Sequence, residues 1–231
     1  MYKLLMSLFA LMFLAAGAMA EDKPTLATVE GAPDLEKVSR AKFRETFVNM
    51  SADFTRYNKL YLGDAYFDYR DVGEPKRYRT NMYSSSTKSF FGIPEEDRKK
   101  FEEITDEAFT KELEKSKKFT ISDSLDENTI IMRGAVVDIV SRVPPEFVGR
   151  SEVYLANVGE ATLVLELLDG KTGDVLARVA ERRAMGRPGG SVDLMTAMPT
   201  NSVTAWADVR RWAASSARRL RSELDAAASG N

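Results

Sequence analysis

The chain has 231 residues and a nearly balanced charge, with 33 Lys plus Arg against 35 Asp plus Glu and a net charge of −2. It contains no Cys and no His, which excludes disulfides, thiolate or imidazole metal sites, and the Ser-His-Asp and Cys-His catalytic systems. The slightly acidic balance argues against a general nucleic-acid binder. We therefore expect no cofactor and no nucleic-acid partner.

The first 20 residues have the pattern of a secretory signal peptide. Lys3 precedes an apolar run of 14 residues, LLMSLFALMFLAAG, and Ala18-Met19-Ala20 forms a small-x-small cleavage site. The run is short for a membrane span. We expect a signal peptide over 1–20, cleavage after Ala20, and a periplasmic or secreted protein that, without Cys, has no lipid anchor.

Residues 21–50 are expected to form a flexible lead-in and a short helix. Pro, Gly and charged residues dominate the first part, which is typical of a flexible segment. Four apolar residues then recur at roughly helical spacing: Leu35, Val38, Phe43 and Phe47. Residues 51–227 are expected to form one α/β domain.

The segment 56–69 predicts the first strand, because it is rich in aromatic and other β-forming residues. The apolar residues before and after Gly63-Asp64 have opposite parity, so a β-bulge is expected there. Residues 70–94 have turn formers at both ends and no clear period. A loop of this length inside a compact domain is often functional.

The clearest helix signal covers 94–118. Pro94 suits the first turn of a helix, and the acidic residues that follow it are favoured by the helix dipole. One apolar stripe continues along the segment: Phe101, Ile104, Ala108, Phe109 and Leu113. Glu–Lys pairs four residues apart indicate a solvated surface on the other side.

The remaining chain predicts a strand, an acidic turn and a strand over 118–143, and then a hairpin of 160–168 and 174–183. A final helix is expected over 204–228. The predicted order is therefore β-α-β-β-β-β-α. The economical fold class is α+β, a mostly antiparallel sheet of about five strands with helices packed on one face.

The stretch LLDGKTGDVL, 167–176, resembles the tail of a phosphate-binding P-loop but is better explained as a turn. A strand rather than a helix follows it, and the first Gly of the motif is missing. In a hairpin turn, Asp169 would accept hydrogen bonds from amides two or three residues on, and Gly173 would take the left-handed conformation. Leu167 would then lie opposite Val175.

The same stretch contains Lys-Thr-Gly, 171–173, one of three signatures of penicillin-recognising serine enzymes. Ser85 and Lys88 fit the Ser-x-x-Lys signature, and Ser-Asp-Ser at 122–124 takes the place of Ser-Asp-Asn. However, Ser85 lies in a Ser-rich stretch rather than at a helix start, and the Asn amide is missing. A Ser/Lys hydrolase is therefore the least favoured alternative.

The acidic segments do not predict a metal site. Residues 123–128 offer oxygen ligands but lack the alternating spacing and central Gly of a calcium loop. Asp64, Asp68 and Asp71 lie along or beside the first strand and are interpreted as a solvated edge. No metal ligands are assigned.

Two clusters of residues in the sequence are candidates for binding surfaces. Aromatic and basic residues are interleaved over 54–91, and such a surface can stack on sugars or form a protein interface, although core packing also explains aromatics there. Its candidate binding residues are Tyr78, Arg79 and Tyr83.

Arg residues also accumulate over 178–221, where they can meet an anionic surface or pair with acids of the first half. Their candidates are Arg210, Arg211 and Arg218.

The C-terminal half resembles the bacterial envelope lipoprotein family catalogued as domain of unknown function number 3313. The resemblance is carried by GEATLVLELLDGKTGDVLARVAERR and WADVRRWAASSARRLRSEL, while DFTRYNKLYLGDAYF and TIIMRGAVVDIV are similar to the family's earlier strands. It covers roughly 51–227 and implies an α/β envelope domain without an assigned activity or functional residues. The lipid-bearing Cys of the family is absent here, so anchoring in the outer membrane is not expected, and the Arg-rich flank is a candidate for a substitute contact with the envelope.

These features predict an exported, non-enzymatic accessory or adaptor protein of the cell envelope. Envelope proteins, cell-wall polymer or an anionic membrane surface are its expected partners. The alternative is a carbohydrate or cell-wall binding module that uses the aromatic and basic 54–91 segment.

Overall fold

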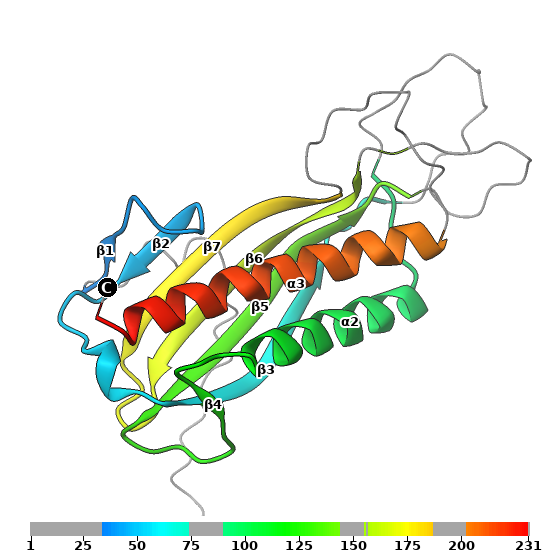
Figure 1. The fold of residues 1–231 in the computed structure, drawn as a ribbon. Helices are drawn as coiled ribbons and strands as arrows, with labels where there is room; N and C mark the ends of the chain where they lie inside the picture. The colour runs from blue at the N-terminus through cyan, green and yellow to red at the C-terminus, as the bar shows by residue number, and fades with distance from the viewer. Residues whose placement is uncertain (1–33, 74–89, 144–154, 156, 187–201, 231) are drawn as a thin grey trace, which may run out of the picture.

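The computed structural model describes residues 34–73, 90–143, 155, 157–186 and 202–230. In this part of the chain, two helices, α2 (Glu95–Leu113) and α3 (Ser202–Ala227), cover one face of a seven-stranded sheet (Figure 1). The predicted signal peptide and the candidates Tyr78, Arg79 and Tyr83 lie outside the described residues.

The sheet is mixed, with the strand order β1-β2-β7-β6-β5-β3-β4. Pairing is antiparallel from β1 through β5, whereas β3 runs parallel to both β5 and β4. The parallel pairs arise because α2 carries the chain from the end of β3 back to its start, as a crossover connection must. The strands are β1 (Glu36–Lys37), β2 (Glu45–Val48), β3 (Lys59–Tyr69), β4 (Thr120–Ile121), β5 (Thr129–Ser141), β6 (Asn157–Asp169) and β7 (Val175–Gly186).

The predicted order β-α-β-β-β-β-α is confirmed as β3-α2-β4-β5-β6-β7-α3. The prediction of about five mostly antiparallel strands is correct only in part, because the sheet has seven strands and two parallel pairings. Both additional strands come from the segment for which a short helix was expected. They extend the sheet beyond β7, where β2 pairs with the first half of that strand.

The prediction of a short helix within 21–50 is wrong, and the burial of the apolar residues in this segment shows why. Phe43 is 3% exposed and belongs to the core beneath the helices. Phe47 instead packs against a small cluster that includes Val164 and Ala180. Residues that serve different clusters do not form one helical stripe, so their spacing was not evidence of a helix.

The bulge predicted in the first strand is confirmed. The register of β3 against β5 shifts between Leu62 and Ala65. Leu62 before the shift and Phe67 after it both pack against the core cluster beneath the helices. One extra residue in β3 therefore keeps apolar side chains of opposite parity on the same face.

The hairpin of β6 and β7 and its turn are also confirmed. Asp169 Oδ1 accepts hydrogen bonds from Lys171 N at 2.8 Å and Thr172 N at 2.9 Å, and Gly173 has a φ of 76°. The expected register is off by one residue, because Val175 lies opposite Leu168. A register shift between Leu167 and Leu168 accounts for the difference.

The two helices pack on each other and on the sheet through one continuous core. Phe101 of α2 is 3% exposed, and its ring centroid lies 6.0 Å from that of Trp212 on α3. Phe101 also meets Phe67 of β3 edge to face, with centroids 6.1 Å apart. The face of α3 that packs in the core contributes four buried residues: Val209, Ala213, Leu220 and Leu224.

Candidate functional site

The Arg-rich flank of α3 is tied to acidic residues rather than held apart as a free basic surface. Arg211 forms an ion pair with Asp208 on the same helix. Arg218 lies 3.7 Å from Glu112 of α2, a carboxylate that is only 8% exposed. Arg210 lies near enough to Glu107 to help lower the pKa of that carboxyl, after the larger effect of Lys111.

Several described aromatics of 54–91 pack in or against the core, which supports the packing interpretation for them, whereas the ring of Phe90 lies against Arg70 and Arg142, 5.1 and 4.8 Å from its centroid. Tyr57 is 3% exposed and donates a hydrogen bond from its hydroxyl to Asp169 Oδ2 at 2.7 Å. Burial, followed by this bond to Asp169, raises the pKa of Tyr57 to about 12. Tyr69 packs its ring against Phe101.

The described polar residues of the hydrolase and calcium hypotheses make local contacts, while Ser85 and Lys88 lie outside the described residues. Ser122 Oγ lies 2.8 Å from Ser124 Oγ, and Lys171 Nζ lies 3.3 Å from Glu127 in an exposed pair. Asp126 accepts from Lys59 Nζ at 2.6 Å. Among the described residues, no group of three or more acidic side chains is placed to hold a metal ion.

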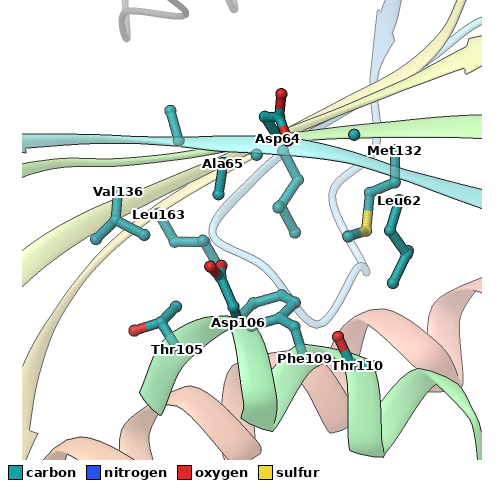
Figure 2. A pocket seen from close by; sticks show the side chains of 14 residues that line it. Leu62, Asp64, Ala65, Thr105, Asp106, Phe109, Thr110, Met132, Val136 and Leu163 are labelled. Carbon is teal, nitrogen blue, oxygen red and sulfur yellow. The ribbon is translucent and has the colours of Figure 1, made fainter. Parts of the chain in front are cut away.

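A pocket of about 170 Å³ lies between α2 and the sheet, next to the bulge of β3 (Figure 2). Figure 2 shows Leu62, Met132 and Val136 pointing from the sheet toward α2, with Phe109 on the helix below them. The bulge residues Gly63, Asp64 and Ala65 also line the pocket. The extra residue in β3 therefore helps to shape the wall of this pocket.

The pocket combines an apolar wall with a polar rim. Asp106 rises from α2 toward β3, whereas Asp64 lies on the strand above with its carboxylate on the side turned away from α2 (Figure 2). Thr105 is also in the lining, but its hydroxyl donates to Phe101 O at 2.8 Å and so serves its own helix. The carboxylate of Asp106 is thus the ionisable group placed to meet an occupant, while Asp64 adds negative charge at the exposed edge of β3.

Negative charge is concentrated at this rim. Burial raises the pKa of Asp106, and the charges of Glu102 and Asp64 raise it further. Glu102 accepts a hydrogen bond from the Tyr69 hydroxyl at 3.0 Å. Within the described residues, neither Asp64 nor Asp106 has an ion-pair partner.

The sequence carries no signal that is specific to Asp106. Glu102–Asp106 and Glu103–Glu107 are both like-charge pairs four residues apart on α2, which disfavours a helix but does not distinguish Asp106 from Glu107. Asp64 was interpreted as part of a solvated edge, and it is exposed. What sequence could not supply is that a bulge on β3 and a carboxylate on α2 line the same pocket.

The pocket lies beside a sheet edge. Lys59 and Leu60 pair with β4, but among the described residues no strand pairs with the outer side of β3 over 61–69. This stretch includes Asp64 and Asp68, both exposed. A bulge and charged side chains are devices that discourage indiscriminate pairing at a free edge.

Comparisons with known proteins give no family assignment. No family model matches the sequence, and no curated protein matches it. In the described part of the chain, no helix is long and apolar enough to cross a bilayer.

Several solved structures can be superposed in part. A PelC dodecamer from Paraburkholderia phytofirmans is 11% identical, with 71% of this chain and 89% of that chain covered at a TM-score of 0.31. A neuraminyllactose-binding hemagglutinin homolog from Helicobacter pylori is 15% identical, with 73% and 83% covered and a TM-score of 0.33. A Xanthomonas campestris protein of the family catalogued as domain of unknown function 330 is 11% identical, with 80% and 90% covered and a TM-score of 0.35. TM-scores below 0.5 do not establish a shared fold or function.

Proposed function

We propose that the protein is an exported, non-enzymatic accessory or adaptor of the cell envelope that binds an extended segment of a partner polypeptide along β3. The observation that carries the proposal is the position of the pocket beside a strand edge that has no described neighbour over 61–69. An extended peptide that adds to such an edge gains main-chain hydrogen bonds, and pockets beside the edge select its side chains.

The size of the pocket favours a side chain over a free metabolite. Sites for small molecules typically enclose about 300–1,000 Å³, whereas this pocket has about 170 Å³. That volume is close to the roughly 150 Å³ cavity that holds a single benzene ring. One long side chain of a docked segment therefore fits the space better than a typical cofactor or substrate does.

The docking part of the proposal is tested with peptides selected from a random display library against the purified protein. We expect a selected peptide to protect the amides of 61–69 from hydrogen exchange, while amides in the middle of β6 keep their exchange rates. N-methylation along the peptide should block binding at every second residue, since only alternate amides face the edge. Failure to select any peptide, or protection confined to another surface, would remove the docking function.

Export is tested separately. The sequence of the mature N-terminus in cells should begin at Glu21, as the small-x-small site before it predicts. A cellular protein that retains residues 1–20 would contradict a cleaved signal peptide.

A further inference from the structure

Asp106 at the pocket differs from several acidic residues of the sheet that are held in ion pairs. Glu166 is paired with Arg178 at 2.6 Å, and Asp138 with Arg70 at 2.5 Å. Asp106 has no such partner among the described residues, and it stands beside the apolar side chains of the pocket while remaining exposed at its rim. An unpaired carboxylate at an apolar wall favours an occupant that brings a positive charge.

The occupant that best complements this site has an apolar stem and a positive end. Lys and Arg side chains bury their methylene groups along apolar surface while their charged ends stay at a polar rim. Here Leu62, Met132 and Phe109 would contact the stem, and Asp106 would face the charge. A neutral aromatic side chain would fill the space but leave the Asp106 carboxylate without a partner.

We infer that the pocket takes a Lys or Arg side chain from the partner segment that adds to β3. The inference rests on the proposed function, because the main chain of that segment is what brings the side chain to the pocket. It also explains how a strand can add to the free edge of β3 although that edge carries charges. Asp64 and Asp68 discourage unselected strands, whereas a basic segment is attracted to them.

The test uses the mature protein and peptides selected as described above. We expect a Lys or Arg at one peptide position in most selected sequences. Asp106→Asn should weaken binding of such a peptide by about five-fold, the effect of losing one partly exposed ion pair. Glu107→Gln is the matched control, because it removes the same charge from the next residue of α2 but does not line the pocket. Its affinity for the peptide should stay within about two-fold of the wild type.

A second peptide separates charge from volume. Replacing its basic residue with norleucine keeps an apolar stem and removes the ammonium or guanidinium group. We expect this peptide to bind the wild type and Asp106→Asn with equal affinity. An Asp106→Asn protein that still prefers the basic peptide by the wild-type factor would overturn the inference.

The possible failures are distinguishable. Peptides that protect 61–69 but show no basic preference leave the docking function standing and overturn only the assignment of the occupant. If N-acetyl-lysine amide binds as tightly as the selected peptide, the occupant is a free amine, and both proposals fail.

Discussion

Asp169 is the ionisable residue that ties the β6–β7 turn to the start of β3. Its side chain is 3% exposed, and it is paired with Arg56. Burial opposes its ionisation, but hydrogen bonds from Tyr57, Thr172 and Lys171 and the charge of Arg56 outweigh burial and lower the pKa of Asp169 to about 2. The turn is thus stabilised by an ionised carboxylate that water scarcely reaches.

This pKa predicts a loss of stability in acid. The folded-state pKa lies below the ordinary value for Asp, so the ionised form stabilises the fold above about pH 4, and this contribution is lost as the pH falls toward about 2. We expect the free energy of unfolding from urea denaturation to fall by on the order of 2 kcal/mol over that window. Asp169→Asn should lack this part of the pH dependence. Tyr57→Phe should show a pH dependence between those of the wild type and Asp169→Asn. Equal pH slopes in Asp169→Asn and the wild type would contradict the assignment.

At the scale of elements, strongly periodic segments were predictable and weakly periodic ones were not. The helix α2 and the hairpin of β6 and β7 were recognisable because each sequence segment carries its own period and its own turn residues. The strands β1 and β2 have only two and four residues, too few to show an alternation. They are strands because the outer side of β7 offers hydrogen bonds to β2, which is a tertiary cause.

The turn of the hairpin provides a direct comparison between a structural and a chemical role for LLDGKTGDVL. Gly173→Val forces a β-branched residue into the left-handed region, where L-residues cost roughly 1–2 kcal/mol. Lys171→Ala removes only an exposed pair with Glu127, and we expect a change below about 0.5 kcal/mol. Urea denaturation of both variants measures the difference. A Lys171→Ala protein that is fully stable but no longer binds the selected peptides would contradict the turn interpretation.

The whole molecule is organised around one core that joins both helices to the sheet. Buried residues of α2, α3, β3, β5, β6 and β7 meet in a single cluster, and the C-terminal part of α3 reaches back to the N-terminal strands. Arg219 of α3 donates to Lys42 O at 2.9 Å, and its guanidinium lies 4.8 Å from the ring of Phe43. Contacts between such distant parts of the chain couple their folding.

We therefore expect one cooperative unfolding transition. Trp206 and Trp212 both lie on α3, so their fluorescence reports the docking of that helix, whereas far-ultraviolet circular dichroism reports all the secondary structure. The two urea curves should coincide, as they do when no intermediate is populated. A fluorescence transition at a lower urea concentration would show that α3 leaves the sheet before the sheet unfolds.

The sequence by itself determined the identity and order of the main elements, the bulge in β3 and the chemistry of the β6–β7 turn, because these depend on local periodicity and on single residues such as Gly173. Only the tertiary structure decided the strand order, the parallel pairing of β3 with β5, and the two added edge strands. It also decided the site: Asp64 and Asp106 are 42 positions apart in the chain, by the difference of their numbers. They line one pocket only because the α2 crossover lays a helix against the bulged strand.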